Sequence, residues 1–240
     1  MTEQRLPPRW PQLGLRLFRG AIPGFAGFHA GPNTEAVRAL ERWSAAEGPW
    51  CVVLWGSAEL GKSFLLQAAL AAADERGASV MFLPLREALG FGPAVLDDLA
   101  NLDFLALDDL EAVAADPAWN EALFNLYNRV HARGGRLLVS ADAAPRALPL
   151  VLGDLQSRLS SGLVYRLDPL DDEDKRDALI KAAAARGLQL PESVANYLLR
   201  RLPRRWPELV AALERLDQVS LSAGRALSIP FVRDALDLRD

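Results

Sequence analysis

Continuous apolar runs alternate with helical patterns along the first 170 residues, and this alternation narrows the possible folds more than any other feature. The runs are rich in Val, Leu and aromatic residues and comprise residues 50–56, 79–85, 103–113, 136–142 and 163–170. Unbroken apolar strands are buried on both faces, as in parallel sheets covered by helices on both sides. The sequence therefore predicts an α/β domain with a parallel sheet.

Helical periodicity fills the segments between these runs and the whole chain after Pro169. Helices are predicted over 33–48, 62–77, 92–102 and 118–135. After Pro169 every segment reads as a helix, which predicts a small all-helical domain. We expect three parts: a flexible N-terminal tail at 1–23, the α/β domain at 24–169 and the helical domain at 170–240.

Composition excludes several classes of protein. The net charge of −4 and the pI of about 5.4 give no sign of nucleic-acid binding. The single cysteine, Cys51, lies in an apolar run, so a disulfide framework is excluded and a buried thiol is expected. His29 and His131 stand alone, which makes a structural zinc site improbable. No segment approaches the roughly 18 apolar residues of a membrane span, so we expect a soluble, cytoplasmic protein.

The stretch "GSAELGKS", residues 56–63, fits G-x-x-x-x-G-K-[ST] and lies between a predicted strand and a predicted helix. In such a loop the glycines allow a tight turn whose N–H groups face phosphate, and the helix N-terminus adds positive charge. We expect Lys62 to neutralise the β- and γ-phosphates and Ser63 to bind Mg²⁺. The predicted nucleotide contacts are Gly56, Ser57, Ala58, Glu59, Leu60, Gly61, Lys62, Ser63 and Phe64.

One alternative for this stretch is a glycine-rich turn with an exposed lysine; the flanking strand and helix favour the phosphate loop. Glu59 is unusual in the middle of the loop, where small residues are common, and its charge is expected to weaken phosphate affinity.

A second candidate set follows the apolar residues of "FLALDDLE", where two acids end a predicted strand. A carboxylate at a strand end beside the phosphate loop is where a Mg²⁺-linked acid must sit. Asp108 is the candidate for the metal shell and Asp109 for orienting water. The alternative is a buried strand whose acids simply meet solvent.

Two further positions are weaker candidates. Ser140 and Asp142 end the run "RLLVSAD", where a polar group could sense the γ-phosphate or hold water; a strand-end turn explains them equally well. Arg158 is either a surface helix residue or an arginine that reaches a neighbouring molecule's γ-phosphate.

Taken in order, the motifs resemble the initiator group of AAA+ ATPases, and within it the Hda family of DnaA-related regulators. The stretches that carry the resemblance are "FAGFHAGPNTEAV", "GSAELGKS", "ALDDLE", "LFNLYNRV", "DLQSRLSSGLVYRLDPLDDEDK", "RGLQLPE" and "LSIPFVRDAL". The resemblance covers nearly the whole chain. It implies an AAA+ core with a helical lid, and no room remains for a DNA-reading helix-turn-helix domain after the lid, so little direct DNA binding is expected.

The resemblance also implies roles for individual residues and a set of ligands. Lys62 and Ser63 match the phosphate and Mg²⁺ ligands, and bound ADP or ATP with Mg²⁺ is expected. Asp142 falls at the first sensor position, and Arg158 falls at the arginine that stimulates hydrolysis of ATP bound to DnaA. The second sensor departs from the pattern because Pro207 stands where the nucleotide-facing arginine is expected; Arg204 or Arg205 is the candidate replacement.

The family works when carried by the DNA polymerase sliding clamp, through a short N-terminal peptide of the type Q-L-x-L-x-L. The stretch "QLGLRLF" resembles that peptide and supplies the predicted clamp contacts Gln12, Leu13, Leu15, Leu17 and Phe18. The alternative is that this stretch forms an edge strand, but the α/β pattern accounts for the sheet without it.

The resemblance thus predicts a regulator that inactivates DnaA, the bacterial replication initiator, in complex with the sliding clamp. Two alternatives remain: a self-assembling AAA+ ATPase that acts as a replication loader, in a dimer or higher oligomer, and a DNA-binding initiator fragment.

Overall fold

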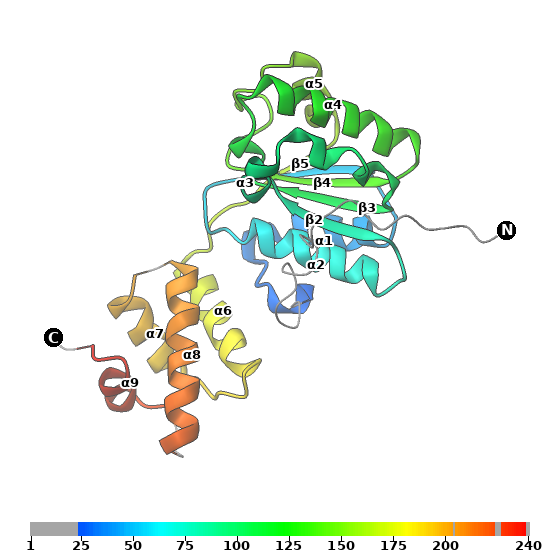
Figure 1. The fold of residues 1–240 in the computed structure, drawn as a ribbon. Coiled ribbons are helices and arrows are strands. Elements are labelled where there is room, and N and C mark those ends of the chain that lie inside the picture. Colours follow the sequence, from blue (N-terminus) through cyan, green and yellow to red (C-terminus); the bar gives the residue numbers. More distant parts are fainter. Residues whose placement is uncertain (1–23, 204, 224–226, 239–240) are drawn as a thin grey trace.

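The structure of the chain, a computed structural model, describes residues 24–203, 205–223 and 227–238 (Figure 1). A five-stranded sheet forms its centre, with every pair of neighbouring strands parallel and the order β2-β3-β4-β1-β5. The strands are β1 Cys51–Trp55, β2 Val80–Pro84, β3 Phe104–Asp108, β4 Arg136–Ala141 and β5 Leu163–Arg166. The parallel sheet predicted from the apolar runs is confirmed.

Helices cover both faces of this sheet. Helices α1 (Thr34–Ser44) and α2 (Lys62–Asp74) lie on one face, and α3 (Leu85–Ala88), α4 (Pro117–Ala132) and α5 (Gly153–Ser161) lie on the other (Figure 1).

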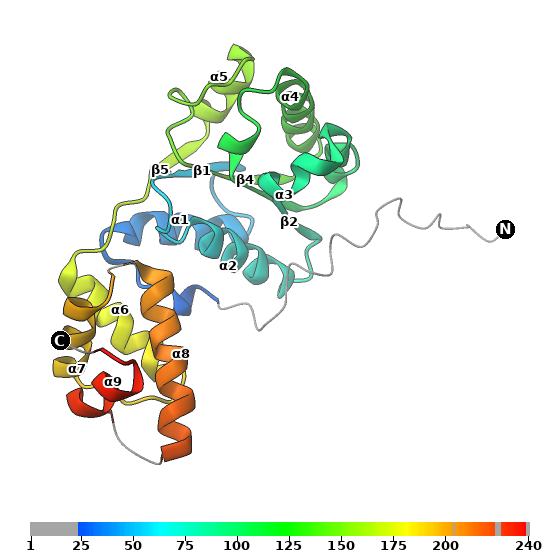
Figure 2. The same ribbon diagram turned by 60° about the vertical axis from the view of Figure 1, so that its left-hand side comes forward.

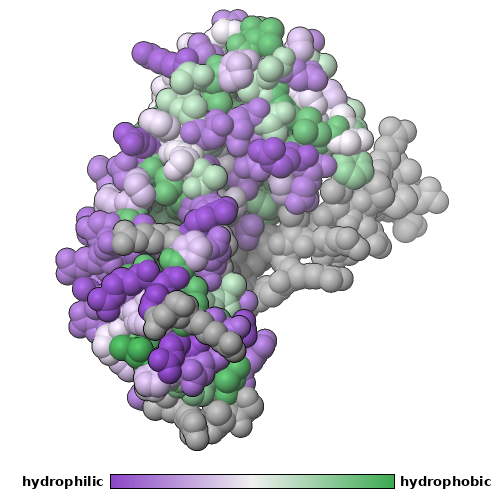
Figure 3. Space-filling view, turned by 90° about the vertical axis from the view of Figure 1, so that its left-hand side faces the viewer, coloured by the Kyte–Doolittle hydropathy of each residue, from purple (hydrophilic) through white to green (hydrophobic). Residues whose placement is uncertain are grey.

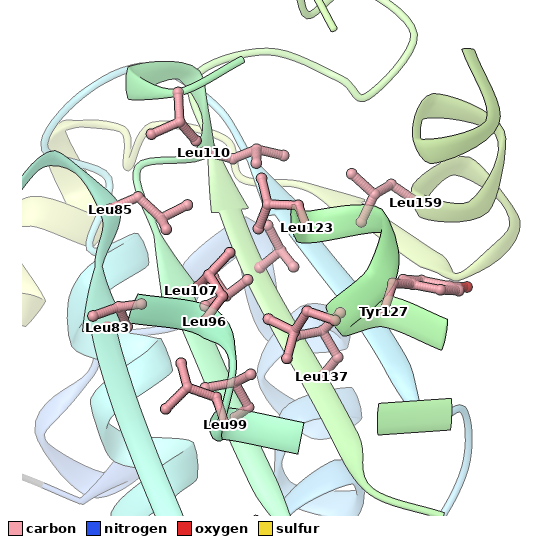
Figure 4. Packing of buried hydrophobic residues seen from close by; sticks show 14 of the residues in the cluster. Leu83, Leu85, Leu96, Leu99, Leu107, Leu110, Leu123, Tyr127, Leu137 and Leu159 are labelled. Atoms are coloured by element: carbon pink, nitrogen blue, oxygen red, sulfur yellow. The ribbon is translucent and has the colours of Figure 1, made fainter. Parts of the chain in front are cut away.

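Strand β1 shows why its sequence is apolar throughout. Cys51 and Val53 belong to the hydrophobic cluster beneath α4 and α5, whereas Val52 and Leu54 belong to the cluster beneath α1 and α2. Successive side chains of a strand point to opposite faces, so a central strand with two covered faces must be apolar at every position. Figure 4 shows the first of these clusters, in which Leu107 and Leu137 of the sheet meet residues of α4 and α5.

Four helices follow the sheet and form the lid: α6 Asp172–Ala184, α7 Glu192–Arg201, α8 Trp206–Ala223 and α9 Ile229–Ala235 (Figure 2). Their buried residues form a separate hydrophobic cluster that includes Leu179, Leu198, Leu213 and Val232. The lid lies on the α1 and α2 side of the sheet in both ribbon views. Hydrophilic residues cover most of the face that carries the lid, and hydrophobic residues appear there in small separate patches (Figure 3).

Two elements differ from the sequence-based prediction. The predicted helix over 92–102 consists instead of two 3-10 turns, Pro93–Leu96 and Leu99–Asn101, whose backbone N–H groups bond to the carbonyl oxygen three residues before them. The strand predicted over 103–113 ends at Asp108. Asp109 has a left-handed backbone, φ +59°, and the apolar residues after it belong to a 3-10 turn, Leu110–Ala112.

The structure bears on two further predictions, the environment of the Cys51 thiol and the membrane-spanning potential of the helices. Cys51 is a free, buried thiol, and burial raises its pKa to about 12. None of the helices among the described residues is long and apolar enough to span a bilayer.

Candidate nucleotide-binding site

The predicted phosphate loop connects β1 to α2, and its backbone requires glycine at two positions. A Cβ atom on Gly61, where φ is +82°, would lie 2.7 Å from the Cε2 atom of Phe28. A Cβ atom on Gly56 would lie 2.9 Å from the carbonyl oxygen of Leu167. The loop is therefore pressed between the segment that precedes α1 and the segment that follows β5, and a larger residue at either glycine would displace one of them.

Lys62 and the start of α2 provide the positive charge of the loop. The Lys62 side chain is buried, and its Nζ donates to the carbonyl oxygens of Gly56 at 2.6 Å and Ser57 at 2.8 Å. No side chain caps the N-terminus of α2, and no acidic residue lies in its first turn. Free N–H groups at a helix N-terminus attract anions, so the loop fits a phosphate group. Ser63, in the same turn, is exposed.

A cavity of about 300 Å³ lies next to this loop. Its walls come from four segments: the loop itself, the residues before α1, the connection from β5 to the lid, and the lid helices. The lining includes Phe28, Asn33, Phe64, Asp168, Lys175 and Trp206. The cavity is thus shared between the α/β domain and the lid.

Asn33 and His29 connect these walls. The amide of Asn33 donates to the carbonyl oxygen of Asp168 at 2.9 Å and accepts from the backbone N–H of the same residue at 2.8 Å. His29 Nε2 lies 3.2 Å from Asp174 Oδ1 in the first turn of α6. Because Asn33 is buried, its two hydrogen bonds hold the connection to the lid firmly against the α/β domain.

Asp108 and Asp109 are joined through Ser140 of the neighbouring strand. The buried Ser140 hydroxyl donates to Asp108 Oδ1 and accepts the backbone N–H of Asp109 at 3.0 Å. One hydroxyl therefore positions the carboxylate of Asp108 and the turn that follows it. The sequence left Ser140 either near a γ-phosphate or water, or in a strand-end turn; its hydrogen bonds in the structure join the Asp108 carboxylate and the backbone N–H of Asp109.

The side chain of Asp109 turns to Arg86, which follows β2. Arg86 Nε lies 3.2 Å from Asp109 Oδ2, and Arg86 Nη2 lies 3.6 Å from Glu111 Oε1. Glu111 also accepts the backbone N–H of Asp142 at 3.1 Å. Burial raises the pKa of Glu111, and the carboxylates of Asp142 and Asp109 add to this shift. Asp142 is exposed at the end of β4.

Arg158 lies on α5, on the sheet face opposite the lid (Figure 1). Its guanidinium carbon is 4.9 Å from the ring centre of Phe124 and 5.7 Å from that of Tyr127, both on α4. The hydroxyl of Tyr127 donates to the carbonyl oxygen of Arg158 at 3.1 Å. The structure does not bring Arg158 into the cavity beside the phosphate loop.

Arg205 makes the contact that the sequence did not predict. It pairs with Glu59 of the phosphate loop, with Nε 2.9 Å from each carboxylate oxygen and Nη2 in hydrogen-bonding contact with Oε1. Pro207, at the expected second-sensor position, lies in the first turn of α8. Arg204 and all five predicted clamp contacts lie outside the described residues.

Sequence reasoning missed several residues that line the cavity, among them Phe28, Asn33, Asp168 and Trp206. Each comes from a segment far along the chain from the phosphate loop, so no local spacing linked them to it. The aromatic character of "FAGFH" before the first helix was the one available signal, because Phe28 packs against Phe64 with ring centres 5.8 Å apart.

Comparison with known families matches two parts of the chain. Residues 93–166 match the family model of the bacterial DnaA ATPase domain, and residues 172–236 match that of the Hda lid domain. The match to the Hda lid therefore spans α6 to α9, and the match to the DnaA domain spans β3, β4 and β5.

Solved structures show the same architecture. Domain III of the Thermotoga maritima replication initiation protein DnaA is 22% identical, with a TM-score of 0.76 over 90% of this chain and 97% of that one. The replication initiator DnaA bound to AMPPCP and single-stranded DNA is 21% identical, with a TM-score of 0.69 over 87% and 67%. AMPPCP-bound DnaA from Aquifex aeolicus is 22% identical, with a TM-score of 0.67 over 80% and 63%. At these identities the likeness establishes the fold, an AAA+ α/β core followed by a helical lid.

Proposed function

This chain is an AAA+ protein related to DnaA and to Hda, and from that premise we propose that it regulates replication initiation by promoting hydrolysis of DnaA-bound ATP. The observation that carries the proposal is the match of the whole helical lid, residues 172–236, to the Hda lid domain. A lid of this type follows a DnaA-like core here, which favours a regulator built from the initiator's own fold.

We propose that the chain binds ADP or ATP in the cavity beside the phosphate loop. The uncapped start of α2 would receive the phosphates, and Lys62 would exchange the carbonyl oxygens of Gly56 and Ser57 for phosphate oxygens. Ser63 and Asp108 would hold Mg²⁺, since both offer oxygen ligands and Ser140 orients the Asp108 carboxylate. When bound, Mg²⁺ supplies positive charge to the phosphates.

Arg158 is the proposed residue that acts on DnaA. Its guanidinium lies over two aromatic rings, and such contacts contribute about 0.5–1 kcal/mol each at exposed sites. A phosphate of the partner's nucleotide offers charged hydrogen bonds that exceed this, so Arg158 can leave the rings on docking. An arginine that neutralises charge in phosphoryl transfer contributes a factor of roughly 10³ to 10⁵ in rate.

The test measures ATP hydrolysis by DnaA with this protein, the sliding clamp and DNA present. Arg158→Ala is expected to fold and to bind nucleotide as the wild type does, yet to remove the stimulation. Arg133→Ala, a change at an exposed arginine that ends α4, is the matched control and is expected to stimulate normally. If Arg158→Ala stimulates as well as the control, Arg158 has no part in the reaction.

Clamp binding is proposed through Gln12, Leu13, Leu15, Leu17 and Phe18. Burying a leucine or phenylalanine fully contributes about 1.5–3 kcal/mol, whereas association costs an estimated 4–15 kcal/mol, so we expect weak, reversible attachment. Replacing Gln12, Leu13 and Leu17 by alanine should remove clamp capture without changing the melting temperature. A large drop in melting temperature would assign these leucines to the folded core instead.

A second candidate is an ATPase that acts on its own assemblies. The Asp108–Ser140–Asp109 arrangement supports it, because the Ser140 hydroxyl orients the Asp108 carboxylate, which could hold Mg²⁺ for hydrolysis. Hydrolysis by the purified chain alone, measured over rising protein concentration, separates the two candidates. A turnover that rises steeply with concentration and disappears in Arg158→Ala supports self-assembly over action on DnaA.

A further inference from the structure

An ion pair between Glu59 and Arg205 joins the phosphate loop to the lid. Glu59 lies at the middle of the loop with φ +68°, and Arg205 immediately precedes α8. Both carboxylate oxygens accept from Arg205 Nε at 2.9 Å, and Nη2 adds a third contact. A guanidinium that engages both oxygens of a carboxylate is geometrically matched to it, which distinguishes this pair from a loose surface contact.

The pair lies on the wall of the proposed nucleotide cavity, since both Glu59 and Arg205 line it. The Glu59 side chain is 29% exposed and that of Arg205 is 63% exposed, so ligand and solvent can reach the pair. Glu208, one turn along α8, is the other carboxylate near this guanidinium, with its Oε1 3.6 Å from Arg205 Nη1. Arg205 is therefore a lid cation in direct contact with the phosphate loop, and its partner is a residue of the loop itself.

A phosphate group and a carboxylate compete for the same guanidinium. Both are anions that accept paired hydrogen bonds from arginine. The hydrogen bond from Arg205 lowers the pKa of Glu59, and the same bond raises the pKa of Arg205, so both groups are charged at neutral pH. A third phosphate bound in this cavity would compete with Glu59 for Arg205 or lie close to the negative charge of Glu59.

We propose that Glu59 determines nucleotide specificity at this site: it takes the place of a third phosphate as the partner of Arg205. The lid is then held against the loop whether a nucleoside diphosphate or triphosphate is bound, and the third phosphate brings no gain in affinity. The inference rests on the proposed nucleotide binding and deepens it, because it assigns the basis of selection between the two ligands.

The test compares the dissociation constants of ADP and of a non-hydrolysable ATP analogue, both with Mg²⁺, for the full chain. In the wild type we expect the two constants to agree within about threefold, or to favour ADP. Glu59→Gln keeps the size of the side chain but removes its charge, which frees Arg205 for the third phosphate. The preference for the triphosphate should rise at least about tenfold, since the freed guanidinium can then donate charged hydrogen bonds to the third phosphate.

Three further variants isolate the cause. Glu59→Gln combined with Arg205→Gln should lose the new preference, because the freed guanidinium is gone. Arg205→Gln alone should leave the ratio of the two constants near that of the wild type. Glu208→Gln removes a second carboxylate close to the Arg205 guanidinium and should also leave the ratio unchanged. Thermal melts confirm that each variant is folded.

Two outcomes overturn the inference, and they are distinguishable from failure of the proposed nucleotide binding. If Glu59→Gln binds both ligands with an unchanged ratio, or if Glu208→Gln shifts it equally, Glu59 does not set the specificity. If the wild type binds neither ligand, and Lys62→Ala behaves identically, the proposed binding and this inference fail together. Binding by the wild type that Lys62→Ala removes keeps the first proposal whatever the Glu59 variants show.

Discussion

The α/β domain and the lid reach their buried cores in different ways. In the α/β domain a sheet is covered on both faces, so two hydrophobic clusters share its strands and the strand interiors are mostly apolar. In the lid four helices enclose one smaller cluster, which each helix reaches with one face. Losing one lid helix therefore opens most of the lid core, whereas the sheet keeps its second face covered when one helix moves.

Buried polar groups show the same contrast. Asn120 of α4 is buried, and its amide donates at 2.8 Å to the carbonyl oxygens of Ala114 and Asp116. Its carbonyl oxygen accepts from the N–H groups of Val151 and Leu152 at 3.0 and 3.2 Å. In the lid, the hydroxyl of Tyr197 is the buried side-chain polar atom that lacks a hydrogen-bond partner among the described residues. Full satisfaction favours a single packing arrangement, so the α/β domain should be the more rigid region.

The largest loss of stability should come from substitutions that create a cavity in the α/β domain or in the lid. Leu54→Ala in β1 and Leu213→Ala in α8 each remove a fully buried side chain, and such changes cost about 2–5 kcal/mol of unfolding free energy. Alkylation of the single cysteine, Cys51, reports opening of the sheet. Leu54→Ala should accelerate alkylation, and Leu213→Ala should loosen only the lid. If both variants accelerate alkylation equally, the two regions unfold as one unit.

Bound nucleotide should stabilise the α/β domain and the lid together, because residues of both line the cavity. ADP at 100 times its dissociation constant should stabilise the wild type by about 2.7 kcal/mol and slow hydrogen exchange in α6 as well as α2. Lys62→Ala should lose both effects, and Lys181→Ala, at an exposed lid position, should keep them. An unchanged wild-type melting temperature with ADP would contradict phosphate binding, and protection confined to α2 would show that the lid does not respond.

Removing the Ser140 hydroxyl tests how much the buried hydrogen bonds of the α/β domain contribute to its stability. Ser140→Ala leaves the buried Asp108 carboxylate and the Asp109 N–H each without one partner, and an unsatisfied buried group costs about 1–3 kcal/mol. Ser44→Ala, which removes a buried hydroxyl bonded only to its own helix, should cost less. Urea unfolding of the two variants measures the difference. Equal losses would mean that the Asp108–Ser140–Asp109 arrangement adds no special stability.

The smallest effect concerns pH. Because burial raises the Cys51 pKa from 9.0 to about 12, the unfolded thiol ionises first as pH rises. The stability associated with the neutral thiol is complete below pH 9 and is lost as pH rises toward 12. At pH 10 the loss should be on the order of 1 kcal/mol. Cys51→Ala should show a shallower decline above pH 9, measured as unfolding free energy against pH; parallel declines would contradict a buried thiol.

The fold was largely predictable because its strands are apolar on both faces, but the strand ends were not. Leu110 and Val113 continue the apolar run of β3, yet they are buried in and after a turn. Burial alone makes these positions apolar, so hydropathy could not separate turn from strand. The left-handed backbone of Asp109, which ends the strand, carries no reliable signal in a non-glycine residue.

The phosphate loop was predictable for a different reason: its chemistry is local, within eight consecutive residues. The contacts that surround it are not local. Ser140 is 32 residues from Asp108, and Arg205 is 146 residues from Glu59. Polar pairs at such separations follow no helix or strand period, so only the folded chain brings them together.

The order of the strands also determines when each strand can pair while the chain is being synthesised. Strand β1 pairs with β4 and β5 and not with β2 or β3, so its two neighbours are the last strands to be made. Roughly 85 residues separate Trp55 from Ala141, the end of β4, which corresponds to roughly 4 to 17 s at translation rates of about 5–20 residues per second. During that interval the most apolar strand of the sheet has no strand partner on either side. Until β4 is complete, the edges of β1 are therefore open to unwanted association with other chains.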